Sequence, residues 1–518
     1  MERDPTTRKL MYFCWGYLLF WFALRLIHSG LFLLAPDEAN YWQWGRHLDW
    51  SYHDQSPMIG WMIHLATSML GHTERAVRLP SVISVTLASI YLVLLARRWF
   101  GPRTARAVAI LSQSVLLFNV GGLMATADGL QAAAWAAVLY HGARAYEENT
   151  WGQWLAAGTW FGLGLLSKYT MVLVAPCIFG FGLMSPAHRN RLATLKPYAG
   201  LLLGLVIFMP VICWNAAHHW NSIRHVAYIG GANRGFSLHF RFLGDFIASQ
   251  AALLSPLVFL AICRSWFKTF VDKGADRAWM PKYLLWTSLP VVAGFALLSL
   301  HTRVYGNWPG AGYLAAIVLA AFTLLDGKEG KQARRRYWVW TLVSSYALTL
   351  VVLIHTVWPF LPIPPDLDRT ATELCGWDQL GTRVAAEVKS MPRPERTFIF
   401  GRRYQIASEL AFYVPGQPFT VSINRWNRPN VYDYWFDDGQ LLGMDAVGVT
   451  RSKDDRRLLQ QVFRSVGPPL PVTLSDRRRG LLGKRREIPV RTLYIYRCFS
   501  FKGGLRWIPP DKNDIRAF

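Results

Sequence analysis

Long runs of apolar residues recur through the first 360 residues and constrain the fold more than any other feature of the sequence. A helix that crosses a bilayer core needs about 20 consecutive apolar residues. Several runs approach or meet that length: 82–95, 198–214, 246–263, 284–300 and 339–360. Hydrophobic residues make up 52% of the 518 positions, which is too apolar for an ordinary soluble enzyme of this size. The sequence therefore predicts a polytopic α-helical membrane protein.

The positions of these and weaker runs predict about eleven transmembrane helices. We expect them near 11–34, 77–96, 106–124, 129–145, 152–166, 169–184, 198–214, 245–263, 282–300, 309–325 and 338–360. The first helix is expected to remain in the protein, because its apolar stretch is longer than that of a signal peptide. No small-residue cleavage site precedes the polar loop that follows it.

The net charge of +24 follows the loops between the predicted helices rather than one continuous surface. Lys and Arg gather in alternate loops, at 3–9, 97–106, 189–196, 264–277 and 328–336. The positive-inside rule makes these loops and the amino terminus cytoplasmic. The outside then holds the loops 35–76, 215–244 and 301–308, the turns near 125–128 and 167–168, and everything after residue 360. We expect a bilayer and no nucleic acid as the partner of this charge.

The segment 361–518 has the composition of a small soluble α/β domain, which this topology places in the periplasm. The proline-rich run 359–365 leads out of the membrane. We expect strands at 397–400, 419–423, 446–450 and 490–496, and helices at 404–413 and 454–466. The basic runs 477–479 and 484–486 are expected in solvated loops, with attraction to anionic headgroups as the alternative. The predicted domains are therefore a membrane part, 1–360, with its first periplasmic loop at 35–76, and the segment 361–518.

The cysteines carry little information about function. Cys375 and Cys498 fall in the outer domain, where an oxidising compartment would allow them to pair, although sequence alone does not test the geometry. The remaining cysteines lie in predicted membrane helices and are expected to be small apolar core residues. No CxxC or HExxH pattern argues for a built-in metal site.

Two adjacent carboxylates follow directly on the first predicted helix. Asp37 and Glu38 come after the apolar sequence Leu-Phe-Leu-Leu-Ala, so at least one of them lies at the membrane surface. A charged side chain at that position is costly unless it is used. Tyr41, Trp42 and Trp44 follow at a spacing that places aromatic faces beside the carboxylates. The loop is a candidate sugar site, and the structural alternative is an aromatic interfacial belt with a helix cap.

Two further ionisable residues stand alone at predicted outer turns. Asp128, in Met-Ala-Thr-Ala-Asp-Gly, either belongs to the site or caps the helix that follows. Lys168 is the basic residue of the next outer turn, where it either extends to the interface or binds a phosphate as a point charge.

The motifs together resemble the bacterial polyprenyl-phosphate-sugar-dependent glycosyltransferases of the GT-C fold, which include the aminoarabinose transferases and, more distantly, the protein O-mannosyltransferases. The resemblance rests on Asp37-Glu38-x-x-Tyr41-Trp42, Tyr52-x-Asp54-x-x-Pro57, Asp128, Ser167-Lys168-Tyr169 and Asn307-Trp308-Pro309. In the outer segment it rests on Gly376-Trp377, the Tyr404 to Tyr413 helix and Tyr432-Asp433-Tyr434-Trp435. Each motif is weak singly, whereas their order and topology are fairly specific.

The resemblance implies an inverting transferase of the bacterial inner membrane that moves a sugar from a polyprenyl (undecaprenyl) phosphate to a periplasm-facing acceptor, either lipid A or another envelope glycan. It implies Asp37 and Glu38 as the catalytic carboxylates, with Asp37 as general base or acceptor-orienting group. The residues it implies for substrate binding are Tyr41, Tyr52, His53, Asp54, Asp128, Lys168, Arg303 and Asn307. No cofactor is certain, and a divalent metal held by Asp54 and His53 is left open.

The first loop departs from this group at two positions. Ser56 stands where a second proline is usual, and Gln55 stands where the aminoarabinose transferases carry a lysine. That lysine would touch the donor phosphate. The phosphate contact must therefore come from elsewhere, with Lys168, Arg303 and His53 as candidates, and the sugar need not be aminoarabinose.

A transporter or lipid flippase is the alternative from another functional class. Such proteins tend to show internal symmetry, broken helices and ionisable residues near the bilayer midplane. Here the carboxylates gather at one face and a large outer domain is attached, which favours an enzyme.

Overall fold

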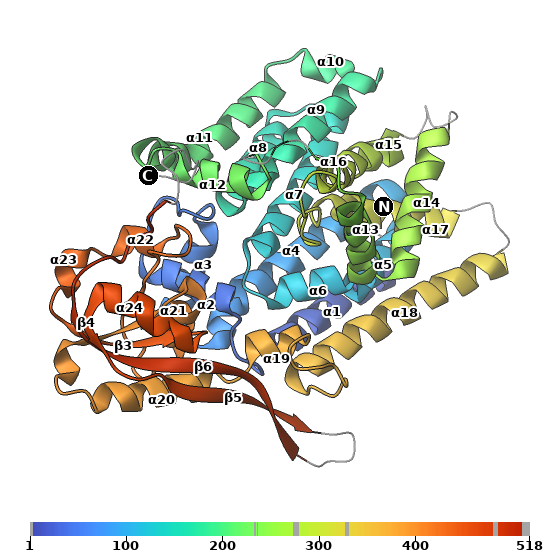
Figure 1. The fold of residues 1–518 in the computed structure, drawn as a ribbon. Helices are drawn as coiled ribbons and strands as arrows, with labels where there is room; N and C mark the ends of the chain where they lie inside the picture. The colour runs from blue at the N-terminus through green and yellow to red at the C-terminus, as the bar shows by residue number, and fades with distance from the viewer. Residues whose placement is uncertain are drawn as a thin grey trace.

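The structure is a computed structural model that describes residues 4–509, apart from 233–234, 236, 273–278, 327–330 and 480–484. It has two parts (Figure 1): a bundle of helices drawn from blue to yellow, and a carboxyl-terminal part, orange to red, that combines helices with a sheet. The carboxyl-terminal part lies beside the blue helices that follow the first transmembrane helix.

Among the described residues, five helical segments are long and apolar enough to cross a membrane, or up to seven if two bent pairs each count as one span. The five are α1 (Pro5–His28), α4 (Glu74–Phe100), α11 (Lys196–Ala217), the pair α15 (Trp279–Trp286) and α16 (Leu289–Ser299), and α18 (Lys331–Val357). The bent pairs are α5 (Pro102–Ser114) with α6 (Leu116–Leu123), and α13 (Phe240–Leu254) with α14 (Pro256–Val271). The chain is therefore a polytopic α-helical membrane protein.

The remaining predicted spans are also helical. They correspond to α7 (Ala127–Glu148), α8 (Trp151–Ser167), the turn η1 (Tyr169–Leu173) with α9 (Val174–Met184), and α17 (Gly312–Asp326). Two predictions need correction. The first helix covers 5–28 rather than 11–34, because Asp4 caps it and Pro5 occupies its first position. The span predicted at 245–263 is bent by 107°, because Ser255 has a positive φ of 69° and Pro256 begins a new helix.

Small residues let two of the membrane helices approach closely. Helix α8 carries Gly158 and Gly162 on one face, and α11 carries Gly200 and Gly204 at the same spacing. A Cβ atom at Gly158 or Gly200 would collide with backbone of the opposite helix. This is the small-residue packing that joins helices in membranes, where lipid already satisfies apolar surface.

The predicted first loop folds into two short helices, α2 (Pro36–Arg46) and α3 (Met58–Leu70). The connection between them is fixed by Tyr52, whose ring stacks on Trp44 with centroids 4.2 Å apart. The Tyr52 hydroxyl donates to the carbonyl oxygens of Trp44 and His47 at 2.9 and 3.0 Å. Tyr52 therefore holds this loop, and its hydroxyl is already engaged.

The carboxyl-terminal sheet has the strand order β2-β1-β3-β6-β4, with β5 paired to β6. Its strands are β1 (Thr397–Gly401), β2 (Thr420–Ser422), β3 (Asp445–Thr450), β4 (Phe463–Val466), β5 (Leu470–Arg479) and β6 (Arg485–Phe501). Strand β1 pairs in parallel with both β2 and β3, whereas β6 is antiparallel to its neighbours. The helices of this part are α19 (Arg369–Leu374), α20 (Trp377–Lys389), α21 (Tyr404–Tyr413), α22 (Tyr432–Trp435), α23 (Asp438–Leu441) and α24 (Arg456–Val462).

Most elements predicted for this part are present, and two expectations were wrong. The helix predicted at 454–466 ends at Val462, because Phe463 and Val466 pair with β6 as strand β4 and bury their side chains. Residues 477–479 and 485–486 of the basic runs lie in the paired strands β5 and β6 rather than in loops; Lys484 and the side chains of both runs fall outside the described residues. No disulfide joins Cys375 and Cys498.

The carboxyl-terminal part packs directly on α2 and α3. Trp42 of α2 meets Phe412 of α21 edge to face at 4.9 Å, and Gln43 donates to the Tyr432 hydroxyl at 3.3 Å. One hydrophobic cluster runs from Trp44 and Ile59 to Phe400 and Tyr432. The first loop and the carboxyl-terminal part therefore lie on the same side of the bundle.

Candidate functional site

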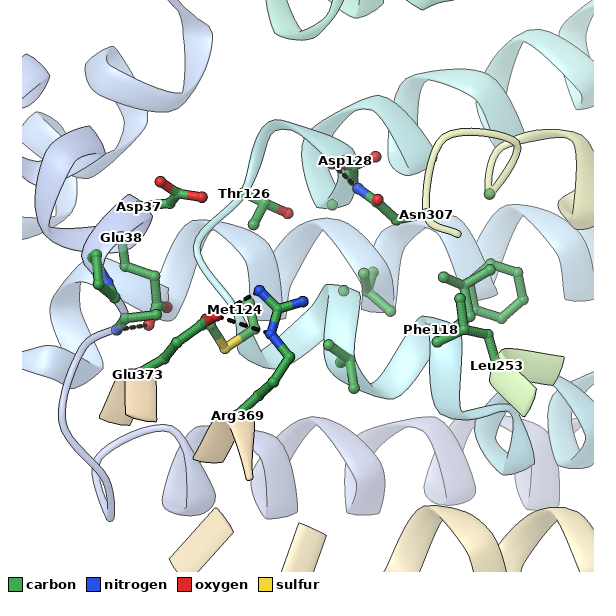
Figure 2. A pocket seen from close by; sticks show the side chains of 18 of the residues that line it. Asp37, Glu38, Phe118, Met124, Thr126, Asp128, Leu253, Asn307, Arg369 and Glu373 are labelled. Carbon is green, nitrogen blue, oxygen red and sulfur yellow. Dashed lines mark hydrogen bonds and ion pairs between the residues drawn. The ribbon is translucent and has the colours of Figure 1, made fainter. Parts of the chain in front are cut away.

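A cavity of about 410 Å³ lies where the helix bundle meets the carboxyl-terminal part. One end is apolar and is built by membrane helices, with Val85, Leu117, Phe118 and Leu253 among its lining residues. The other end is polar and receives side chains from the first loop, from the start of α7 and from α19. Figure 2 shows this division: Phe118 and Leu253 lie at one end, and Asp37, Glu38 and Glu373 at the other.

Asp37 lies in the first turn of α2 and lines the polar end of the cavity. Its carboxylate is exposed to the cavity, and Oδ1 accepts a long hydrogen bond of 3.4 Å from the Tyr404 hydroxyl. Removal of water by the surrounding protein raises the pKa of Asp37, and the nearby carboxylates of Glu373 and Asp54 raise it further. Arg428 and Tyr404 oppose it. Asp37 is thus a reachable carboxylate whose proton affinity exceeds that of an ordinary aspartate.

Glu38, the neighbour of Asp37, is fully buried and fully engaged. Its Oε1 accepts from Arg78 Nε and Ala125 N, each at 2.8 Å, and Oε2 accepts from Arg78 Nη2 at 2.6 Å and Ala35 N at 2.9 Å. Arg78 also donates to the carbonyl oxygens of Ser29, Phe32 and Leu33. The Glu38–Arg78 pair therefore joins α2, α4 and the chain between α1 and α2, which favours a positioning role for Glu38.

Asp128, Lys168 and Asn307 come together at the cavity, as the sequence suggested for each separately. Lys168 Nζ lies 2.6 Å from Asp128 Oδ1, and Asn307 Nδ2 donates to Asp128 Oδ2 at 3.2 Å. Asp128 and Asn307 line the cavity (Figure 2). Because the ammonium group already neutralises Asp128, Lys168 is a weaker candidate for a phosphate contact than the sequence indicated.

Asp54 and His53 lie in a compact polar cluster with His225 of helix α12 (Asn221–Ile229). Their ligand atoms lie within 4.8 Å of one another, a spacing that would suit a cation. However, Arg428 Nη1 lies 3.1 Å from Asp54 Oδ1 and 3.2 Å from His225 Nε2. The guanidinium occupies the position that a metal ion would need, so the cluster does not fit a divalent cation and we derive no catalytic step from one.

Electrostatics support this reading of Asp54. Burial works to raise the pKa of Asp54, but Arg428, His225 and His53 outweigh it and hold that pKa well below its usual range. His53 Nδ1 lies 3.2 Å from the Tyr434 hydroxyl, which joins the cluster to the carboxyl-terminal part. Asp54 is therefore an ionised partner of Arg428, and the pair fixes the first loop to that part.

The remaining sequence candidates differ in position. Burial and the carboxylates of Asp37, Asp128 and Asp54 raise the pKa of Tyr41 well above its usual value, and Tyr41 is not among the lining residues of the cavity. Tyr52, whose hydroxyl is engaged with backbone, stands behind the site rather than in it. Arg303 is exposed and is not among the lining residues of the cavity. Substrate contact by Tyr52 or Arg303 would need a rearrangement.

The carboxyl-terminal part supplies cavity residues that the sequence did not indicate. Arg369 and Glu373, one turn apart on α19, form an ion pair of 2.5 Å at the polar end of the cavity. The cavity is also lined by Thr372, Gln405, Arg451 and Arg491. Tyr404 had a partial signal, since it begins one of the family-like motifs. The arginines had none, because basic residues are frequent throughout this chain and each one reaches the cavity only through the fold of the sheet.

Comparison with known proteins supplies the context for this geometry. Residues 54–214 match the protein family described as dolichyl-phosphate-mannose-protein mannosyltransferase. The chain is 27% identical over 366 residues to the lipid A galacturonosyltransferase RgtD of Rhizobium johnstonii, covering 68% of this chain and 72% of that protein. It is 25% identical over 308 residues to the lipopolysaccharide core galacturonosyltransferase RgtA of the same organism, covering 57% of this chain and 60% of that one.

Solved structures agree on the architecture. The structure of ArnT from Cupriavidus metallidurans bound to undecaprenyl phosphate superposes with a TM-score of 0.63 at 15% identity, covering 93% of this chain and 98% of that one. At this identity the likeness establishes the fold. Together with the sequence relatives, it supports a bacterial membrane glycosyltransferase of the GT-C fold.

Proposed function

We propose that the chain transfers a sugar from a polyprenyl phosphate to a glycolipid acceptor of the cell envelope, with lipid A as the first candidate. The observation that carries this proposal is the division of one cavity into an apolar end between membrane helices and a carboxylate-bearing end below a soluble domain. A lipid-linked sugar has the same division, with an isoprenoid chain at one end and a polar head at the other.

The sidedness of the molecule supports a lipid-linked donor. Helix α4 begins beside the site, where Glu74 accepts from the Tyr413 hydroxyl at 3.1 Å, and ends near the basic residues Arg97 and Arg98. Its 27 residues span about 40 Å, the thickness of a bilayer. With the basic end cytoplasmic, the site and the carboxyl-terminal part are periplasmic. Nucleotide sugars are cytoplasmic, so a sugar reaches this site on a lipid carrier.

The chemistry that fits the site is displacement at the anomeric carbon. An acceptor oxygen forms a bond to that carbon while the bond to the phosphate oxygen breaks, and the polyprenyl phosphate leaves with the electron pair. Attack in line with the leaving group inverts the anomeric configuration. Asp37 takes the proton when the acceptor is a hydroxyl group, and its raised pKa suits it to that role. When the acceptor is a phosphate, Asp37 positions it and stabilises positive charge on the ring.

The other residues divide by contact. Asp128, held by Lys168 and Asn307, offers a fixed carboxylate for sugar hydroxyls. Arg451 lines the cavity from the start of the loop after β3, and we assign it the contact to the donor phosphate in place of the lysine that Gln55 replaces. Glu38 positions Asp37 through the backbone of α2 without touching substrate.

Mass spectrometry of lipopolysaccharide and membrane glycolipids tests this function. A strain that lacks the gene is compared with the same strain carrying the wild-type gene or the Asp37→Asn variant. We expect one monosaccharide mass to disappear from one glycolipid in the deletion strain, to return with the wild-type gene and to stay absent with the variant. Unchanged glycan masses in all strains would contradict the proposal.

A further inference from the structure

A second cavity of about 250 Å³ adjoins the first inside the carboxyl-terminal part. Its lining consists of polar residues: Arg403, Tyr404, Gln405, Arg428 and three asparagines. Gln405 lines both cavities, and Tyr404 reaches from the second cavity to Asp37. The two spaces therefore meet beside the proposed catalytic carboxylate.

The sheet explains why these residues gather. Arg403 follows the carboxyl end of β1, Asn424 follows β2 and Arg451 follows β3, and these three strands are parallel. In open α/β sheets, ligands bind outside the carboxyl ends of parallel strands, where the loops of several strands meet. In this chain that edge of the sheet faces the membrane cavity, because Arg451 lines that cavity and Gln405 lines both cavities.

The charge of the second cavity selects for an anion. Two guanidinium groups line it, and no carboxylate does among the described residues. Arg428 is already paired with Asp54, so Arg403 supplies the uncompensated charge. Arg403 is exposed and forms no ion pair within the described part of the chain. Partial burial and the nearby Arg403 lower the pKa of Arg451, whereas Glu373 opposes the shift. An anionic group beside Arg403 would accept charged hydrogen bonds from its guanidinium group.

The carboxamides add the complementary half of a saccharide site. Asn427 donates to the Arg402 carbonyl oxygen, which fixes its side chain, and Asn424 Nδ2 donates to Asn430 Oδ1 at 3.0 Å. Asn424 and Asn430 are buried, so the half-buried amides of Asn427 and Gln405 are the ones that can meet sugar hydroxyls, with both donor and acceptor groups. An anion with attached hydroxyls suits this lining better than a bare ion.

Arg428 connects this cavity to catalysis. Its Nη1 contacts Asp54 and His225, and its Nη2 donates to the Tyr404 hydroxyl at 3.1 Å. The same hydroxyl donates to Asp37. A ligand on Arg428 is therefore linked through Tyr404 to the carboxylate proposed to act on the acceptor.

Resting on the proposed function, we propose that the second cavity binds an anionic saccharide group of the acceptor, carrying a phosphate or a carboxylate. The donor is placed elsewhere, because its lipid chain occupies the apolar end of the main cavity and draws its head to that side. The acceptor approaches from the soluble part, past Arg403 and Tyr404, to Asp37.

A binding experiment tests the assignment without transfer activity. The full chain in nanodiscs is titrated with glucose 1-phosphate, galacturonate and glucose, and calorimetry gives each Kd. We expect at least one of the two anionic sugars to bind about tenfold more tightly than glucose. The Arg403→Ala variant should lose that preference. Arg464→Ala is the matched control, because Arg464 is an exposed arginine of β4 outside both cavities. Equal affinities in the wild type, or an unchanged preference in Arg403→Ala, would overturn the assignment.

Steady-state kinetics distinguish acceptor from donor. With a polyprenyl-phosphate sugar and a phosphorylated lipid A acceptor, Arg403→Ala should raise the acceptor KM about tenfold while the donor KM stays within about twofold. A rise confined to the donor KM would place the donor head in this cavity and overturn the proposal. If the wild type binds anionic sugars as expected yet transfers none, the proposed function fails while the binding site stands.

Discussion

Lys168 Nζ lies 2.6 Å from Asp128 Oδ1, and this ion pair joins two turns that are 40 residues apart in the chain. Because Lys168 is buried and Asp128 half-buried, each charge depends on the other. We expect Asp128→Asn and Lys168→Met each to lower kcat/KM about 10- to 100-fold through misplacement of the substrate. The double variant should be no worse than the poorer single variant, and additive losses would show that the two act separately.

The hydrogen bond from Tyr404 to Asp37 predicts a change in pH dependence. It stabilises the ionised carboxylate, so Tyr404→Phe raises the pKa of Asp37 further above its usual range. Transfer that needs ionised Asp37 falls as the pH drops through this pKa. The acid limb of kcat/KM should therefore move to higher pH in Tyr404→Phe, by less than about one unit because the bond is long. An acid limb that moves to lower pH would contradict this coupling.

The buried pair of Glu38 and Arg78 predicts a folding defect. Glu38→Ala leaves the guanidinium of Arg78 buried without its carboxylate, which costs about 3–5 kcal/mol. We expect a large loss of monodisperse protein in detergent and a lower melting temperature. Glu395→Ala is the control, since Glu395 is exposed in the carboxyl-terminal part. If Glu38→Ala instead folds normally but is inactive, Glu38 has a direct catalytic role.

Glu409 of α21 is a buried carboxyl group whose oxygens have no hydrogen-bond partner in the described structure. Burial raises its pKa well above the usual value. Folding therefore takes up a proton at Glu409 when the unfolded chain is ionised there. The cost of this protonation to the stability of the fold is absent below the unfolded pKa of about 4.3 and grows as the pH rises above it. Glu409→Gln should raise the melting temperature by about 2–4 °C at pH 8 and by less at pH 5. A larger gain at pH 5 would refute this assignment.

Much of the fold follows from the sequence because hydrophobic length and loop charge are local signals. The apolar runs contain helices throughout, and the strands at 397–400 and 446–450 were predicted from short buried runs. The bend at Ser255 was missed although Pro256 is visible in the sequence, because a proline inside an apolar run can also kink a continuous span and the positive φ of Ser255 is set by packing. Strand β4 was missed for a related reason: residues 463–466 follow a helix without a break, and only pairing with β6 makes them extended.

The candidate site divides in the same way. Asp37, Asp128 and Asn307 line one cavity. The sequence singled out the two aspartates as carboxylates at outer turns and Asn307 by the family resemblance. The partner of Lys168 was not predictable, since the sequence does not show which outer turns meet. Arg428 and His225 were missed because they reach Asp54 from segments 203 residues apart, through folding of both parts. The contact between Arg428 and Asp54 is the reason why the metal site that the sequence left open at Asp54 does not fit a divalent cation.

Asp37→Asn tests the central claim most directly. The purified variant is assayed with a polyprenyl-phosphate sugar and glycolipid acceptor, beside Asp49→Asn, which alters a carboxylate of the same loop that lines neither cavity. We predict a fall in transfer of about 100-fold or more for Asp37→Asn, with donor binding and melting temperature retained, and little change for Asp49→Asn. Full transfer by folded Asp37→Asn would contradict the account.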